Sequence, residues 1–438
     1  MTLLVLLLVI LIIATLKNKV YGLAFYFLIR LCIPDTCRVG NLSYNTVSLL
    51  IFVVLLIVFY HKSLNCSNSI LLKFRKEVFF LFGGIILLSF FAVIVPLGYQ
   101  YKYLSQFFVT EFIPSFCILL LISSEKEYKL LVRVMAFGAL FNCAYGILTF
   151  FIDNNPIYDN LTSISASELA QYDREEGRFG FTRKAEGIYG KFNGKIMMSL
   201  ISLIIFTFFY NKNFLSSKFK KLLLSSAFIV SVLTSQRSGL FGIFAFFILI
   251  ISRKRIFSLL KKYSIFLVLA VFVIIATPQL QGLRDLLSSV IFILDDKKQD
   301  QLGTSGSSVE MRLEQFDMVW AMLSSGFLSG LGYAFDQYRG EFFRFDNDAL
   351  RGLESFFLKI LINNGLLGFI LWGRFLYSLL KPTYKFWHIY DNKYFFSYLL
   401  AYFIAILFTD ISGSFFLFLA CATLNLIYMK FNDSLNKI

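Results

Sequence analysis

Arginine in polar segments is the feature of this sequence with the clearest chemical meaning. Arg178, Arg183, Arg237, Arg312 and Arg351 lie between apolar blocks, in segments that the charge pattern described below places on the outer side of a membrane. Outer segments of membrane proteins normally carry few basic residues. A guanidinium group offers several N–H donors in a planar fork that matches phosphate oxygens, and it keeps its charge in a partly dry site. These positions predict an anionic ligand, and a diphosphate would suit them.

Two of these arginines have a specific alternative role in place of ligand binding. Arg237 lies in TSQRSGL, a connection so short that its guanidinium group is held at the membrane surface, where Ser238 and Gly239 allow close backbone approach. Its alternative role is contact with lipid head groups. Arg312 lies in an amphipathic segment, and its alternative is a solvated helix face. The sequence leaves both alternatives open.

Carboxylates are the candidate general bases, because neither histidine of the chain, His61 or His388, falls in an outer segment. Glu354 is the best candidate, since it opens an apolar span at the membrane surface close to the second polar segment. The alternative is an acidic residue favoured by the helix dipole. Further charges lie within or near spans, where they must be paired or hydrated, and the sequence does not assign their partners: Glu111, Arg133, Lys359 and Arg374.

Motifs for metal or nucleotide chemistry are missing from the sequence. There is no P-loop, GxSxG or HExxH pattern and no acidic metal motif in an outer segment. The six cysteines show no metal-ligand spacing, and only Cys32 and Cys37 could pair. We therefore predict neither a metal nor a cofactor.

The elements that position these residues are membrane-spanning helices. Hydrophobic residues make up 58% of the 438 residues and charged residues only 16%, and the apolar residues form blocks of roughly 17–25 residues, which suit a bilayer core. We predict an all-α, polytopic membrane bundle of about thirteen helices, within a range of 12–14. The expected spans are 1–16, 20–34, 45–60, 78–98, 104–123, 130–152, 195–210, 221–234, 238–252, 264–277, 355–380, 394–409 and 412–428.

Basic residues alternate between connections and so predict the orientation. The formal charge of +15 is concentrated in short connections, which is typical of cytoplasmic loops and not of a nucleic-acid-binding surface. The remaining connections then face outward, including both long polar segments. The predicted division is N-terminal spans (1–152), a first large periplasmic loop (153–194), central spans (195–277), a second large periplasmic loop (278–354), and C-terminal spans with a cytoplasmic tail (355–438).

The second loop contains a predicted amphipathic helix. Val309, Leu313, Phe316, Trp320 and Leu323 recur at three- and four-residue spacing within SSVEMRLEQFDMVWAML. A capping-box pattern of Ser307 and Glu310 begins this helix, and the glycine-rich stretch SGFLSGLGYAF ends it. We expect its apolar stripe to lie on the bundle or at the membrane interface.

Three of these segments together resemble the bacterial O-antigen polymerase and O-antigen ligase group. They are the hairpin TSQRSGLFG, the arginine helix with its Gly-x-Gly turn in MRLEQFDMVWAMLSSGFLSGLGYAF, and the span ESFFLKILINNGLLGFILW. The first loop adds RKAEGIYGKFNG, which matches an Arg-x-x-x-Gly pattern of the group but lacks its Asn-Pro-Asn. The similarity covers roughly residues 178–370.

The resemblance implies glycan transfer from undecaprenyl diphosphate at the periplasmic face of the inner membrane, without metal or nucleotide sugar. Arg237 and Arg312, with Arg183 and Arg178, would then bind the diphosphate, and Glu354 would accept the proton of the attacking hydroxyl. The group further implies lipid-linked oligosaccharides, membrane lipids and a chain-length regulator protein as partners, and no nucleic acid.

Ligases of this group carry a His-Asn pair where this chain has Glu354-Ser355, so the resemblance favours a polymerase of O-antigen or of another surface polysaccharide, with ligase as the alternative. A flippase or transporter is a further alternative, which would predict short loops and related halves.

Overall fold

The computed structural model describes residues 2–34, 36–40, 42–64, 69–152, 155–161, 187–188, 216–233, 245–246, 248–249, 309–342, 353, 355–390, 393–408 and 415–431. Over these residues the protein is almost entirely helical, so the predicted all-α class is confirmed. Helices suit a membrane because they satisfy their backbone hydrogen bonds internally. The exception is a small antiparallel hairpin of β1 (Arg38–Val39) and β2 (Leu42–Ser43).

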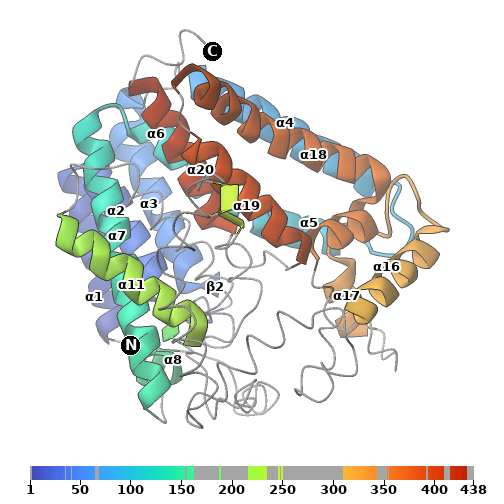
Figure 1. Ribbon diagram of the computed structural model, residues 1–438, viewed down its shortest axis with the longest axis horizontal. Helices are drawn as coiled ribbons and strands as arrows, with labels where there is room; N and C mark the ends of the chain where they lie inside the picture. Colours follow the sequence, from blue (N-terminus) through green and yellow to red (C-terminus); the bar gives the residue numbers. More distant parts are fainter. Residues whose placement is uncertain are drawn as a thin grey trace, which may run out of the picture.

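One group of helices forms the N-terminal bundle, on the left in Figure 1. Its members are α1 (Thr2–Lys17), α2 (Lys19–Cys32), α3 (Tyr44–Tyr60), α7 (Glu125–Phe151) and α11 (Ser217–Leu233). Helix α2 is central, because it packs against α1, α3 and α7, while α11 covers α7. Cys32 and Cys37, the one pair that the sequence allowed, are both free thiols.

A second group contains the C-terminal helices. Helix α4 (Ser69–Ser89) runs beside α18 (Phe356–Tyr390), and α18 also packs against α19 (Tyr394–Phe408) (Figure 1). Helix α20 (Phe415–Phe431) packs against α6 (Ile113–Leu121) and joins this group to the first. The short helix α8 (Pro156–Leu161) follows α7, and η1 (His61–Ser63) extends α3.

A π-helical turn interrupts the helix beside α20. Helix α5 (Leu97–Phe107) continues through the π-turn η2 (Phe108–Phe112) into α6 without leaving the helix axis. A π-turn inserts one extra residue and rotates the side chains that follow, and such turns are frequent at functional sites. Here it places Glu111 inside the bundle.

Four described helices are long and apolar enough to cross a membrane: Tyr44–Ser63, Leu97–Leu121, Glu125–Phe151 and Phe356–Tyr390. Shorter apolar helices accompany them at Leu3–Lys17, Tyr394–Leu407 and Phe415–Phe431. The predicted spans 195–210 and 264–277, and most of 238–252, lie outside the described residues. The number of about thirteen therefore stays a prediction, as do the two large loops.

Helix α18 is broken near its beginning, which the continuous apolar pattern of the predicted span did not indicate. Gly365 has φ 64° and ψ −165°, a conformation essentially restricted to glycine, and it separates a half-helix at 356–364 from a longer one at 366–390. A break inside an apolar helix leaves backbone carbonyl and N–H groups without their usual partners. Those groups need other partners, because unpaired polar groups are costly in a bilayer.

The glycine-rich segment 326–332 supplies these partners. The N–H groups of Leu331 and Gly332 donate to the carbonyls of Ile362 and Asn363 at 2.8 and 3.1 Å. In return, the N–H groups of Leu366 and Leu367 donate to the carbonyls of Phe327 and Leu328 at 3.0 and 3.2 Å. We call this arrangement the docked-loop unit: segment 326–332 together with the break at Gly365.

Glycine is required at the contact because two backbones meet there. A Cβ atom on Gly330 would lie 2.5 Å from the backbone of Asn363, and one on Gly365 would lie 2.5 Å from the backbone of Leu328. The Gly-x-Gly turn and the GLLG span of the sequence are thus the two sides of a single contact. Neither side can accept a side chain without separating them.

The turn at 90–96 holds the docked-loop unit on its other side. Helix α4 ends at Ser89, earlier than the predicted span 78–98, and the N–H groups of Ile94 and Val95 both donate to the carbonyl of Leu331. The hydroxyl of Ser329 donates to the carbonyl of Phe91 at 3.0 Å. The residues after the C-terminal end of α4 are therefore irregular because they bind the loop.

Helix α16 (Val309–Leu323) confirms the predicted helix of the second loop, although its capping residue Ser307 lies outside the described residues. Val319 and Leu323 are buried against Leu331 and the start of α17 (Phe335–Phe342). Of the predicted apolar stripe, however, Leu313, Phe316 and Trp320 are exposed. Most of the stripe thus faces away from the bundle, as a helix at the membrane interface would require.

Candidate functional site

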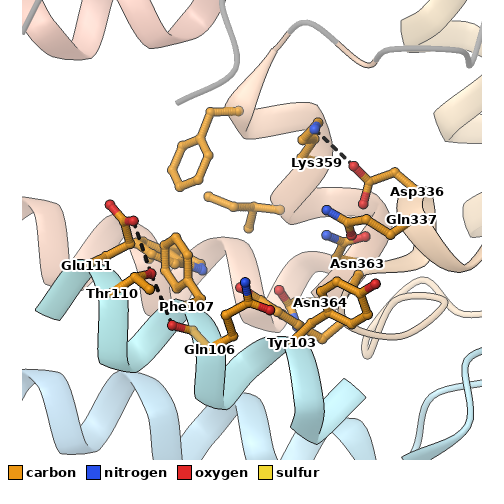
Figure 2. A pocket seen from close by; sticks show the side chains of 15 residues that line it. Tyr103, Gln106, Phe107, Thr110, Glu111, Asp336, Gln337, Lys359, Asn363 and Asn364 are labelled. Carbon is orange, nitrogen blue, oxygen red and sulfur yellow. Dashed lines mark hydrogen bonds and ion pairs between the residues drawn. The ribbon is translucent and has the colours of Figure 1, made fainter. Parts of the chain in front are cut away.

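A cavity of about 290 Å³ lies between α5, η2, the start of α17 and the beginning of α18 (Figure 2). It borders the docked-loop unit, because the half-helix 356–364 forms one wall and residues 333–337 form another. Its lining is Tyr103, Gln106, Phe107, Thr110, Glu111, Tyr333, Ala334, Asp336, Gln337, Phe356, Lys359, Ile360, Asn363, Asn364 and Trp372. Amides, aromatic rings and a few charges therefore share one space.

An ion pair crosses one side of the cavity. Lys359 Nζ lies 2.9 Å from Asp336 Oδ2, and each side chain is 18% exposed (Figure 2). Asp336 is in the first turn of α17, where a helix favours a negative charge. The pair provides a partner for Lys359, one of the charges that the sequence could not pair.

Two amide side chains fix the turn that carries Asp336. Asn363 Oδ1 accepts from the Phe335 N–H at 3.2 Å, and Gln100 Oε1 accepts from the Tyr333 N–H at 2.9 Å. Between them Ala334 has φ 63°, a conformation that side-chain-bearing residues rarely adopt. The strained turn persists because hydrogen bonds to α5 and to α18 both fix it. The fixed turn keeps Asp336 opposite Lys359.

Glu111 forms the end of the cavity nearest the bundle core. Its Oε2 accepts from the Phe416 N–H at 2.6 Å, which caps the first turn of α20, and its Oε1 accepts from the Thr110 hydroxyl at 3.1 Å. Arg30 lies 3.9 Å away, and its guanidinium group also stacks over the Phe416 ring at 4.2 Å. This carboxylate therefore ties η2, α2 and α20 together, which is a structural role for a charge that the sequence left without a partner.

Arg374, which is not part of the cavity lining, also has a partner. It binds Glu77 of α4 through Nε at 3.0 Å and lies over the Phe80 ring. This contact joins α4 to the second half of α18.

The residues predicted for catalysis or diphosphate binding remain untested. Arg178, Arg183, Arg237, Arg351 and Glu354 lie outside the described residues. Arg312 is in α16, but its side chain is not among the described ones. Phe356, two positions after Glu354, lines the cavity.

Sequence reasoning missed the polar residues that do line the cavity. The motifs of the sequence assign no role to Asp336, Gln106 or the pair Asn363-Asn364, although two adjacent asparagines before a glycine inside an apolar span are an unusual signal. Asn-Gly sequences commonly end helices, so this one could have indicated both the break and the polar surface beside it.

The fold and the cavity define an integral membrane protein, a helical bundle with a polar and aromatic cavity beside a broken helix. Residues 222–373 match the family model for O-antigen ligase, and this match confirms the resemblance to the O-antigen polymerase and ligase group. The matched range includes α16, α17, the docked-loop unit and the first part of α18. No curated protein matches the chain.

Proposed function

We propose that this protein is a surface-polysaccharide polymerase, a metal-independent glycosyltransferase of the inner membrane that works at the periplasmic face. It would move the growing glycan from undecaprenyl diphosphate to a new lipid-linked repeat unit. The observation that carries this proposal is that the family match coincides with the docked-loop unit and with the cavity wall that this unit holds. The part of the chain that matches the family therefore supplies two of the three regions that line the cavity, and α5 with η2 supplies the third.

In the proposed reaction, a hydroxyl oxygen of the acceptor sugar bonds to the anomeric carbon of the donor glycan. The bond between that carbon and the diphosphate oxygen breaks, and undecaprenyl diphosphate leaves with the bonding electrons. Glu354 accepts the hydroxyl proton, and Arg237 and Arg312, with Arg178 and Arg183, stabilise the charge on the leaving diphosphate. Arginine suits this role because it binds phosphate oxygens through two N–H groups at once.

A polymerase is favoured over a ligase by Glu354-Ser355, since the ligases of the group have a His-Asn pair there. The break in α18 is a feature that secondary transporters also use, which gives a transporter or flippase one supporting observation. In transporters the broken backbone coordinates the transported ion, whereas here segment 326–332 occupies those backbone groups. We therefore favour the enzyme.

Deleting the gene should leave surface glycans that carry a single repeat unit, because ligation continues while elongation stops. Gel separation of the surface glycans measures this. A ladder of normal lengths in the deletion strain would contradict the proposal. Polymer that stays on the lipid carrier and never reaches lipid A–core would support the ligase instead.

Replacing Arg237 or Arg312 with glutamine should reduce elongation by about 10²–10³-fold, the usual effect of removing one donor to a developing negative charge. The matched control is Arg38→Gln, which makes the same change at an exposed position in β1. The amount of protein in the membrane is measured beside elongation. Normal elongation in both arginine variants would remove these residues from the proposed site.

A further inference from the structure

The charge of the cavity is balanced. Its described lining contains one cation, Lys359, and two carboxylates, Asp336 and Glu111. Lys359 pairs with Asp336 at 2.9 Å, and Glu111 lies beside Arg30. A diphosphate is held by an excess of basic groups, and this lining has none. The cavity is therefore suited to an uncharged ligand.

Amide groups that have no partner in the described part of the chain line the same space. The side chains of Gln106, Gln337 and Asn364 make no hydrogen bond to any residue in the described part of the chain, although Asn364 is only 2% exposed. A primary amide both donates and accepts hydrogen bonds. Buried polar groups normally have partners, so an almost buried amide at a cavity indicates a ligand or solvent that can do both. Sugar hydroxyls have this property.

Aromatic rings form the rest of the wall. Phe356 and Trp372 pack edge to face, with ring centroids 5.2 Å apart, and Tyr103 lies across the cavity on α5. Aromatic faces suit the C–H faces of a pyranose ring, while the amides suit its hydroxyl edge. The volume of about 290 Å³ is just below the range for small-ligand pockets, about 300–1,000 Å³, so it suits a single ring.

We propose that this cavity binds one uncharged pyranose ring of the glycan substrate, and that the lipid diphosphate binds elsewhere. The inference rests on the proposed function and adds to it a subsite with a stated ligand class. Gln106 and Gln337 bind the ring hydroxyls, and the Lys359–Asp336 pair closes one side. The ring belongs either to the acceptor repeat or to the donor glycan.

Saturation-transfer NMR on the full chain in lipid nanodiscs tests this. The probe is the single-repeat oligosaccharide, released from the carrier lipid by mild acid and separated by length. We expect saturation of one ring. Gln106→Ala and Gln337→Ala should each raise the Kd of the oligosaccharide about three- to tenfold, which is the effect of losing one net hydrogen bond. Both residues are exposed to the cavity, so these variants should fold. Ser105→Ala, on the same helix but outside the lining, should bind as the wild type does.

The possible outcomes distinguish a ring of the acceptor from a ring of the donor. They also test the sugar subsite separately from the proposed polymerase function. Saturation of the non-reducing terminal ring assigns the cavity to the acceptor, and saturation of the reducing-end ring assigns it to the donor. Absence of saturation in the wild type, or displacement of the oligosaccharide by inorganic diphosphate with the same sensitivity to Gln106→Ala, would overturn the inference. A deletion strain with single repeats would still support the polymerase in that case. A deletion strain with a normal ladder would contradict the polymerase whatever the NMR result.

Discussion

A Gly365→Ala variant should be destabilised by about 2–6 kcal/mol. An alanine at φ 64° and ψ −165° is strained by about 1–3 kcal/mol, and forcing its methyl group into packed structure adds about 1–3 kcal/mol. The methyl group would lie 2.5 Å from the backbone of Leu328 and from the N–H nitrogen of Gly330, neither of which can rotate away. We expect the docked-loop unit to separate, and the midpoint of thermal unfolding to fall in detergent-purified protein.

Gly373→Ala is the matched control, because Gly373 is in the same helix and a Cβ atom there would have no neighbour within 4 Å. Alanine in a helix is favoured over glycine by about 0.5–1 kcal/mol, so this variant should be as stable as the wild type or slightly more stable. Equal unfolding midpoints for the two variants would show that the contact between Gly365 and segment 326–332 contributes nothing to stability.

A Glu111→Ala variant should lose about 3–5 kcal/mol of stability, the usual effect of removing one partner from a buried ion pair. The change removes the carboxylate near Arg30, whose side chain is only 5% exposed, and it removes the acceptor of the Phe416 N–H at the start of α20. Thermal unfolding followed by size-exclusion chromatography measures the loss.

Glu77→Ala is the control for Glu111→Ala, because it breaks an ion pair whose arginine, Arg374, is 45% exposed. Exposed pairs contribute about 0–1 kcal/mol, so this variant should change little. The double variant Glu111→Ala with Arg30→Met should recover part of the loss, since the buried charge of Arg30 is then removed together with the carboxylate beside it. A similar loss for Glu77→Ala and Glu111→Ala would contradict the buried-pair interpretation.

Much of the helical architecture follows from local patterns. The spans predicted at 45–60, 130–152, 221–234 and 394–409 correspond to α3, α7, α11 and α19 within a few residues at each end. Apolar length and basic flanks determine these helices, and both are local properties. The amphipathic helix α16 was predictable for the same reason, because its three- and four-residue spacing lies within one segment.

The break in α18 was not predictable in the same way. Hydropathy continues across Gly365, and the energy that stabilises the break comes from segment 326–332, more than thirty residues earlier in the chain. Ion-pair partners were hidden for the same reason, since Arg30 and Glu111 meet only after α2 and η2 have packed. The cavity combines residues from three regions of the chain, so only the fold could show it. The predicted arginines and Glu354 stay predictions.

The docked-loop unit also determines where the chain can accommodate insertions. Because segment 326–332 is hydrogen-bonded to both halves of α18 and to the turn at 90–96, it is a fixed point within the polar stretch before α18. Insertions before Val309, or between Phe342 and Leu353, leave that fixed point and the Asp336 turn in place. We therefore expect insertions on either side of the fixed point to be tolerated, whereas Gly330 and Gly365 tolerate almost no change.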